Sequence, residues 1–304
     1  MSEQIVKDRQ LVQSLLRQHY DDFKLEIQLS GCTGGDIHRS YRVTIISSSQ
    51  VPDQLFAKVN NVSHQTVIES EHNSLCILQK LAVPFYPEPI IKGFDIDSCC
   101  LIMTHHRLGK LDEKTAADLG EILAQQHQFS AATFGWEADN HIGLSKQYNA
   151  QTSVWIDFYR TQRLLPQLKL AASNKLDSDL IKQVDRIMAS LEIFFPNYNP
   201  VPSLLHGDLW SGNVAQETTS QQPLLFDPAP FYGDREVDIA MTELFGKFPL
   251  KFYQAYQRDW PLHEGYANRK PLYNLYHALN HFNLFGTAYS EMIRKFCTGL
   301  QHPD

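Results

Sequence analysis

Three polar residues follow short apolar runs in the second half of the chain. Asp208 ends the segment LLHGD (204–208), Asn213 lies five residues further on, and Asp227 follows Leu224-Leu225-Phe226. A carboxylate can orient an attacking hydroxyl and accept its proton, while an amide and a second carboxylate supply oxygen ligands of the kind Mg²⁺ prefers. The set therefore predicts phosphoryl transfer from ATP with Mg²⁺, in which Asp208 is the base and Asn213 and Asp227 hold the metal.

The same three residues also fit a purely structural role, because Asp and Asn are common in turns. An isolated Asp and Asn at this spacing would more often mark a turn than a site. The preceding His206-Gly207, the apolar run before Asp227, and a glycine-rich turn and lysine near the N-terminus favour the catalytic interpretation. We expect His206 to anchor the loop through hydrogen bonds, and Asp238 to cap or tie the same loop.

A lysine interrupts the apolar run Leu55–Val59, which is typical of a strand. Lys58 is predicted to bind the α and β phosphates of ATP and to pair with a carboxylate on the following helix. As an alternative, it would be an edge-strand lysine that discourages strand pairing. The partner would be Glu69 or Glu71, and we favour Glu71 because Leu75, four residues later, puts it on a packed helix face.

A glycine-rich turn, GCTGGDIHR (31–39), separates two strand-like runs. Backbone N–H groups of Gly31, Gly34 and Gly35 could cover phosphates, although the spacing matches neither G-x-G-x-x-G nor the Walker pattern, and an ordinary hairpin loop is the alternative. Met103 is placed with these residues in the nucleotide-binding set. Trp210 and Asp234 are candidate substrate contacts, and Trp210 fits a core position equally well.

The elements around these residues divide the chain into two parts. Strand-like runs at 24–30, 41–46, 55–59 and 100–104 and a helix at 66–81 occupy the first hundred residues. Helical periodicity dominates afterwards, at 115–129, 151–170, 176–195 and 272–285, with Thr115 at an N-cap position. We expect domains at 1–105 and 106–304, with the boundary near His105–Lys110.

Bulk composition excludes several classes of protein. The 304 residues are 43% hydrophobic and 20% charged, as in ordinary globular proteins. A net charge of −7 without a basic run argues against a nucleic-acid partner, and no apolar stretch is long enough to span a membrane. Five cysteines without regular spacing argue against zinc or a disulfide framework, so a cytoplasmic protein with reduced thiols is expected.

The motifs together resemble the fructosamine kinase, or ketosamine-3-kinase, family. HGDLWSGN (206–213) carries the most specific part of the resemblance, and nearly the whole chain is covered by further segments: GCTGGDIHRSY (31–41), FAKVNN (56–61), LGEILAQQHQ (119–128), FGWEADNHIG (134–143), WIDFYRTQRLLPQL (155–168), FDPAPFYGDREVDIAMTELFG (226–246) and LYNLYHALNHFNLFG (272–286). The family belongs to the aminoglycoside-phosphotransferase-like branch of the protein-kinase-like fold.

This resemblance implies an α+β, bilobal protein-kinase-like fold. A small N-terminal lobe would hold an antiparallel sheet and one main helix, and a larger C-terminal lobe would be mostly helical. The family phosphorylates the 3-hydroxyl of ketoamines, and the unstable product releases the amine. Matched to the family, Asp208 is the base, Asn213 and Asp227 are the metal ligands, and Lys58 with Glu71 anchors phosphate.

Two departures from the family pattern, Ala229–Phe231 and IGLSKQYN (142–149), leave the acceptor open. Alternatives are a kinase for another small hydroxyl compound, such as a sugar, amino alcohol or aminoglycoside, or a nucleotide-binding pseudokinase. The partner is expected to be a small glycated amine. A monomer is expected, with a redox-linked dimer through Cys32 as an alternative, because family members tend to carry a cysteine in this loop.

Overall fold

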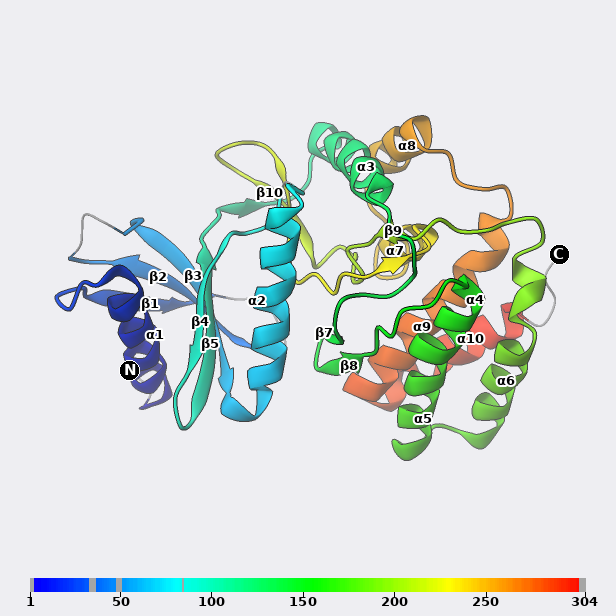
Figure 1. Cartoon of the computed structure of the whole chain (residues 1–304), viewed down its shortest axis with the longest axis horizontal. Coiled ribbons are helices and arrows are strands. Elements are labelled where there is room, and N and C mark those ends of the chain that lie inside the picture. The colour runs from blue at the N-terminus through cyan, green and yellow to red at the C-terminus, as the bar shows by residue number, and fades with distance from the viewer. Residues whose placement is uncertain (1–2, 33–36, 48–50, 84, 301–304) are drawn as a thin grey trace. The chain divides into compact units, whose positions relative to one another are not determined.

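The computed structural model describes residues 3–32, 37–47, 51–83 and 85–300. The chain forms two compact units (Figure 1). The smaller unit comprises residues 1–109 together with 216–226, and the larger comprises 110–215 and 227–304. The segment 216–226 thus returns to the first unit from deep in the second half of the sequence, which the pattern of the sequence did not indicate.

A five-stranded sheet in the order β1-β2-β3-β5-β4 forms the small unit, and every neighbouring pair is antiparallel. Register places Ser40 opposite Lys58, and Lys58 opposite Leu101 on the other side. A second sheet joins β6 to the returning segment in the order β11-β10-β6. The strands are β1 (Ile27–Gly31), β2 (Arg39–Ile45), β3 (Gln54–Asn61), β4 (Pro89–Phe94), β5 (Ser98–Thr104), β6 (Leu108–Gly109), β10 (Val214–Glu217) and β11 (Pro223–Leu225).

The two faces of the five-stranded sheet are covered by different helices (Figure 1). α1 (Glu3–Tyr20) buries Leu11, Val12 and Leu16 against one face. α2 (Gln65–Lys80), preceded by the short 3-10 helix Val62–His64, buries Ile68 and Leu75 against the other. Because successive strand residues point to opposite faces, Ala57 and Val59 lie under α1 while Lys58 lies on the α2 side.

The small unit contains more regular structure than the sequence analysis expected. The strands predicted at 24–30, 41–46, 55–59 and 100–104 and the helix at 66–81 overlap β1, β2, β3, β5 and α2. α1 and β4 were not predicted. The apolar residues of α1, among them Leu11, Val12 and Leu16, do recur at helical spacing, so the amphipathic pattern of this helix was present in the sequence and was overlooked.

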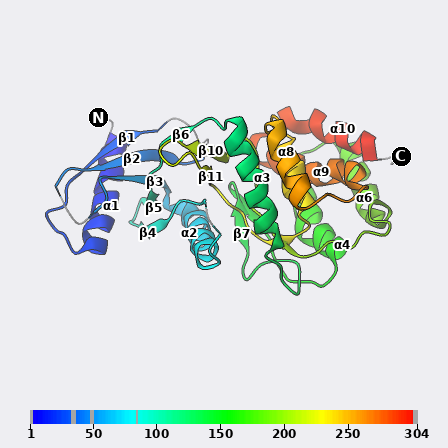
Figure 2. The ribbon, with the colours of Figure 1, turned by 90° about the horizontal axis from the view of Figure 1, so that it is seen from above.

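The large unit is mostly helical, with short strand pairs near the predicted catalytic residues. Figure 2 shows α3 and α8 side by side in this unit. Its elements are α3 (Glu113–Gln128), β7 (Asn140–Ile142), β8 (Ser145–Gln147), α4 (Trp155–Phe158), a π-helix (Tyr159–Leu164), α5 (Leu165–Ser173), α6 (Ser178–Ala189), a 3-10 helix (Leu191–Phe194), β9 (Ser203–Leu204), β12 (Tyr232–Gly233), α7 (Glu236–Thr242), α8 (Leu250–Asp259), α9 (Tyr266–Phe285), a 3-10 helix (Thr287–Tyr289) and α10 (Ser290–Leu300).

One helix start differs from its prediction. Thr115 was expected to cap the helix at 115–129, but α3 begins at Glu113 and its N-cap is Asp112. The Asp112 carboxylate accepts a 2.7 Å hydrogen bond from the backbone N–H of Thr115. Asp is as good an N-cap as Thr, and here it precedes Glu113, whose charge also favours the first turn.

Among the described residues, no helix is both long and apolar enough to cross a membrane.

A buried carboxylate ties α1 to the strand that follows the glycine-rich turn. Asp8 is fully buried and accepts hydrogen bonds from Arg39 Nε at 2.7 Å, Arg39 Nη2 at 2.9 Å and the Tyr41 hydroxyl at 2.7 Å. Burial alone would raise the pKa of Asp8, but hydrogen bonds from Arg39, Tyr41 and Gln4 outweigh it and the pKa is lowered. The cluster therefore holds the first residues of β2 against α1.

Replacing this carboxylate should destabilise the protein in a pH-dependent way. We expect Asp8→Asn to lower the free energy of unfolding by about 3 kcal/mol at pH 7. This is the low end of the range for breaking a buried ion pair, because Arg39 is partly exposed. The pKa of Asp8 is lower in the folded than in the unfolded protein, so its ionised carboxylate stabilises the fold at pH values above the unfolded pKa. This contribution is lost as the pH falls through the pKa of the folded state. Denaturant unfolding between pH 3 and 7 should therefore show a steeper acid loss in the wild type than in Asp8→Asn.

The control is Asp118→Asn, which removes an exposed ion pair with Lys114 on α3. Such pairs contribute little, so this variant should unfold as the wild type does. An Asp8→Asn protein as stable as the wild type at pH 7 would show that the cluster does not hold α1 in place.

Candidate active site

The loop that carries Asp208 is joined by backbone hydrogen bonds to the segment after Asp227. β9 pairs with β12, Leu205 N–H donates to Phe231 O at 3.0 Å, and Ala229 N–H donates to His206 O at 2.9 Å. Gly207 has φ +85°, and a Cβ there would lie 2.0 Å from Ala229 O. Only glycine allows both this conformation and this approach, so Gly207 sets how closely the two segments meet.

A buried carboxylate on α7 holds the turn. Asp238 accepts hydrogen bonds from the backbone N–H groups of His206 at 2.7 Å and Gly207 at 2.9 Å, and from His127 Nε2 at 3.1 Å. Burial lowers the pKa of His127, so its ring is neutral and donates to Asp238 while Nδ1 accepts from the Tyr256 hydroxyl. The prediction that Asp238 ties the loop is confirmed.

His206 takes the structural role expected of it. Its ring is fully buried, and Nδ1 accepts a 3.1 Å hydrogen bond from the backbone N–H of Asp208. Because Nδ1 accepts, the proton of the neutral ring is on Nε2. The imidazole therefore fixes the backbone of the catalytic loop from within the large unit.

Asp208 and Asn213 contact each other directly. Asn213 Nδ2 donates to the backbone oxygen of Asp208 at 2.8 Å and to its carboxylate at 3.1 Å. Burial, followed by the negative charge of Asp227, raises the pKa of Asp208 to about 7, although the Asn213 hydrogen bond opposes the shift. The Asn213 amide is thus in contact with Asp208, and Asp227 lies near enough for its charge to act on the Asp208 carboxylate.

The oxygens of this group suit a hard cation. The amide nitrogen of Asn213 donates to Asp208, which leaves Oδ1 as the atom of that side chain that could bind a metal. Asp227 is exposed and has φ +56°, a conformation that Asp and Asn tolerate better than most residues. The described residues contain no cluster of three or more His, Cys, Asp or Glu placed to hold a metal, which is compatible with Mg²⁺, because that ion takes few protein ligands and completes its shell with water and phosphate.

The predicted lysine and its carboxylate pair within the small unit. Lys58 Nζ lies 2.5 Å from Glu71 Oε1, and both side chains are about nine-tenths buried. Glu71 lies three residues after Ile68 and four before Leu75, on the face of α2 that packs on the sheet. Glu69 instead accepts a hydrogen bond from Gln65 at 2.8 Å.

The other predicted nucleotide contacts have mixed outcomes. Gly31 ends β1, and a Cβ added to it would meet nothing within 4 Å, so space does not require glycine there. Gly34 and Gly35 lie outside the described residues. Met103 is 3% exposed and packs with Ile68, Leu75 and other core residues on the α2 side of the sheet. Its side chain is therefore a core element, with almost no surface open to a ligand.

One candidate substrate contact is corrected by the structure. Asp234 is 1% exposed, and its carboxylate accepts from the hydroxyls of Tyr198 and Tyr273 and from the backbone N–H of Glu236. These donors occupy the group inside the large unit, so a substrate cannot reach it. Trp210 is only partly buried, and its ring lies against Gly212 and Phe245.

Comparisons with known proteins agree with this geometry. The fructosamine kinase family model matches residues 8–301. A probable ketoamine kinase of Vibrio parahaemolyticus is 37% identical over 284 residues, which cover 92% of this chain and 95% of that protein. The chain belongs to the fructosamine kinase family.

Two further relatives are similar to this family member. The chloroplastic protein-ribulosamine 3-kinase of Arabidopsis thaliana is 43% identical over 175 residues, 57% of this chain and 53% of that protein. The crystal structure of a protein assigned as a fructosamine-3-kinase from Haemophilus somnus matches with a TM-score of 0.82 at 26% identity, covering 96% of this chain and 97% of that one. The predicted family, protein-kinase-like fold and enzyme class, a kinase acting on a sugar hydroxyl, are confirmed.

The sequence analysis missed a buried amide network that holds the segment after Asp227. Asn140 Nδ2 donates to Pro230 O at 2.8 Å, and Gln147 Nε2 donates to Ala229 O at 3.0 Å. Asn149 donates to Asn140 Oδ1 at 2.9 Å. Gln147 and Asn149 lie two residues apart around β8, so their alternation is the one local sign that both face inward.

The network is completed by an arginine in the π-helix. Arg163 Nη2 donates to Asn149 Oδ1 at 2.8 Å, and its guanidinium lies 3.9 Å from the centre of the Phe231 ring. π-Helical turns often mark functional sites, and this one directs an arginine toward the segment that follows Asp227. The residues 142–149, which depart from the family pattern, therefore support that segment from inside.

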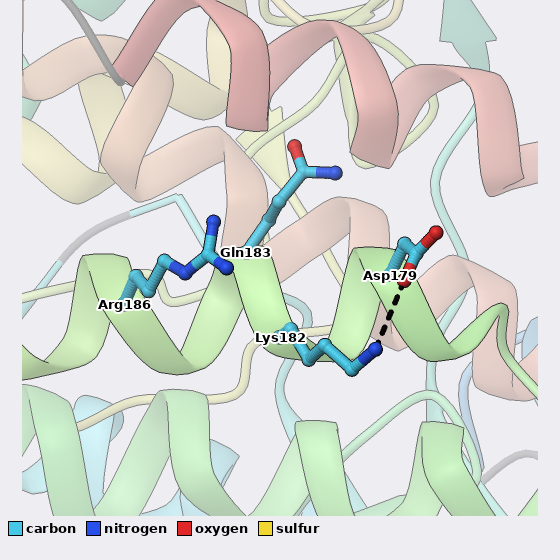
Figure 3. A pocket seen from close by; sticks show the side chains of 4 residues that line it. All are labelled: Asp179, Lys182, Gln183 and Arg186. Carbon is cyan, nitrogen blue, oxygen red and sulfur yellow. Dashed lines mark hydrogen bonds and ion pairs between the residues drawn. The ribbon is translucent and has the colours of Figure 1, made fainter.

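A surface pocket of about 330 Å³ lies elsewhere, on α6. Asp179, Lys182, Gln183 and Arg186 line it, and Lys182 pairs with Asp179 at 3.1 Å (Figure 3). All four side chains come from one exposed helix face, and none belongs to the predicted site. The pocket is a gap between flexible surface side chains and does not change the assignment of the site.

The Lys58–Glu71 pair should behave as one unit in nucleotide binding. We expect Lys58→Ala and Glu71→Ala each to raise the dissociation constant of ATP about tenfold or more, and the double variant to be little worse than either, because each change breaks the same contact. Titration of ATP into the four proteins of the cycle measures this. Glu69→Ala is the matched control and should bind as the wild type does; a severe Glu69→Ala with a silent Glu71→Ala would reverse the assignment.

Proposed function

We propose that this protein uses ATP to phosphorylate the 3-hydroxyl of ketoamines such as fructosamines or ribulosamines, which leads to release of the amine. The observation that carries the proposal is the Asp208–Asn213–Asp227 group, built on the HGDLWSGN loop, in a chain of the fructosamine kinase family. Ketoamine and ribulosamine kinases among the relatives support the acceptor class.

Asp208 is the base in this proposal. Its carboxylate orients the sugar hydroxyl for attack on the γ-phosphate and accepts its proton as the O–P bond forms. Two neighbours set its basicity in opposite directions, because Asp227 raises its pKa and Asn213 lowers it. Burial is the largest cause of its raised pKa, and it makes Asp208 a better proton acceptor than an ordinary surface Asp.

Asn213 Oδ1 and the Asp227 carboxylate would hold Mg²⁺. When bound, the ion neutralises charge on the β and γ phosphates of ATP. Its positive charge beside Asp227 would also offset the repulsion that raises the pKa of Asp208. In the small unit, Lys58 would bind the α and β phosphates, held in position by Glu71.

We further propose that the protein acts in the cytoplasm as a monomer. All five cysteines are free, as expected in a reducing compartment. Cys32 is exposed, so a dimer linked through this residue stays an alternative, which the mass of the protein under oxidising and reducing conditions would distinguish.

The decisive experiment is ATP consumption with fructose-, ribulose- and erythrulose-amines beside plain sugars and aminoglycosides. We expect turnover with one or more ketoamines, with phosphate on the 3-hydroxyl by NMR. Asp208→Asn should lower the rate about 10²–10⁴-fold while ATP affinity changes little, because the carboxylate acts on the acceptor. A variant that keeps a tenth of the rate would remove Asp208 from this role, and turnover confined to another hydroxyl compound would overturn the acceptor assignment.

Asp227 should affect nucleotide binding only when Mg²⁺ is present. Asp227→Asn keeps a residue that tolerates φ +56° but removes the charge from the metal ligand. We expect weaker Mg²⁺-ATP binding and slower turnover, with little change in metal-free ATP affinity. Asp227→Ala also adds backbone strain. A thermal melt of that variant separates a loss of stability from a loss of metal binding. Equal Mg²⁺ dependence in the wild type and Asp227→Asn would show that the metal lies elsewhere.

A further inference from the structure

Five aromatic side chains form a continuous, partly exposed surface on the large unit, here called the aromatic surface: Trp210, Phe245, His281, Phe285 and Tyr289. Ring centres are 5.9 Å apart from Trp210 to Phe245, and 4.5 Å from Phe245 to His281. His281 is in turn 5.6 Å from Phe285 and 5.1 Å from Tyr289. Phe285 is 46% exposed, and the other four are partly buried.

This surface begins in the catalytic loop. Trp210 follows Asp208 by two residues, so their Cα atoms are at most about 7.6 Å apart. Gly212 allows the ring to lie against the loop, because a Cβ there would be 2.3 Å from ring atoms of Trp210. Ser211 Oγ donates to Phe245 O at 2.8 Å and joins the loop to the second ring. The first ring of the aromatic surface therefore belongs to the loop that carries Asp208.

The rings of this surface are not used by cations of the protein itself. Elsewhere in the large unit, Arg163, Arg235 and Arg269 lie over aromatic rings at 3.9 to 4.2 Å. Within the described part of the chain, no lysine or arginine lies over any of the five rings. Aromatic faces attract cations, so this group of rings presents unused negative faces next to the catalytic loop.

His281 adds a hydrogen-bond acceptor to the same surface. Its Nδ1 donates to His277 O at 2.9 Å, so Nε2 carries the lone pair of the neutral ring. Burial lowers the pKa of His281 even though the His277 hydrogen bond opposes the shift, which keeps the ring neutral near pH 7. A neutral imidazole accepts an N–H donor and does not repel a positive charge.

We propose that the aromatic surface binds the protonated amine nitrogen and the attached amine substituent of the ketoamine substrate, and so selects glycated amines over plain sugars. The inference rests on the proposed function and deepens it, by naming the residues that recognise the amine group of the substrate. A ketoamine nitrogen is a secondary amine that carries a proton near neutral pH. It lies three bonds from C3, so a sugar with its 3-hydroxyl at Asp208 directs the amine and its substituent onto adjacent residues.

The test compares two acceptors that differ only at this atom, in its positive charge and in its N–H donors. One is a fructosamine of a simple alkylamine, and the other is its ether analogue, in which oxygen replaces the amine nitrogen. We expect the wild type to prefer the amine in kcat/KM. Phe285→Leu and Phe245→Leu keep an apolar side chain but remove the π face, and each should lower the amine-to-ether ratio about three- to tenfold, as expected for a cation–π contact.

Phe94→Leu is the matched control, because Phe94 is an exposed phenylalanine of the small unit, 57% exposed on β4. It should leave the ratio and both rates unchanged. A general loss of structure would lower both substrates equally and leave the ratio intact, so an unchanged ratio in both Phe285→Leu and Phe245→Leu overturns the inference. Phe285 is largely at the surface, so its variant tests the proposal even if Phe245→Leu folds poorly.

Three other outcomes would also overturn the proposal. If the wild type turns over the amine and the ether equally well, the proposed function stands but the aromatic surface does not read the amine. If the wild type phosphorylates neither compound nor any ribulose- or erythrulose-amine, the proposed function itself fails. A fall in molecular mass of the native protein on substitution of Phe285 would assign the surface to contact with a second copy of this chain instead.

Discussion

The catalytic loop depends on one buried carboxylate. Asp238 receives the backbone N–H groups of His206 and Gly207 and the imidazole of His127, all inside the large unit. A buried backbone N–H without a partner destabilises the fold about as much as a lost hydrogen bond. The tight turn before Asp208 is therefore stable only with the Asp238 carboxylate in place as an acceptor. α3 supplies His127 and α7 supplies Asp238, which makes the position of Asp208 a property of helix packing.

The same turn brings the segment that carries Asp208 close to the segment that follows Asp227. Gly207 lies so close to Ala229 that no side chain fits, and the backbone ladder from Leu205 to Phe231 sets the register between the segments. Burial raises the pKa of Asp208, and the negative charge of Asp227 adds to this shift. Amides of Asn140 and Gln147 hold the second segment from the opposite side. The arrangement keeps negative charge in a place where a bound cation would relieve the repulsion.

The small unit is organised around the two faces of one sheet. On the α2 side, Lys58 pairs with Glu71, and on the α1 side, Asp8 pairs with Arg39. Both ion pairs tie a helix to a strand, and β2 and β3 are direct neighbours in register. Of the predicted nucleotide residues, Gly31, Lys58 and Met103 therefore lie on strands of this sheet, and Glu71 lies on the helix that covers one of its faces.

The sequence by itself was sufficient to identify the family and the order of the main elements, and it singled out the residues of the candidate site. Asp208, Asn213 and Asp227 each follow a short apolar run, and Glu71 shares a helix face with Leu75, so local spacing was sufficient to single them out. Met103 was predicted to contact nucleotide and Asp234 to contact substrate, but packing buries both side chains, because exposure depends on elements far along the chain. The return of residues 216–226 to the small unit, the Asp238–His127 anchor, the amide network and the five-ring aromatic surface bring together residues up to about a hundred positions apart. Only the tertiary structure could decide these, because contacts of that kind leave no local period in the sequence.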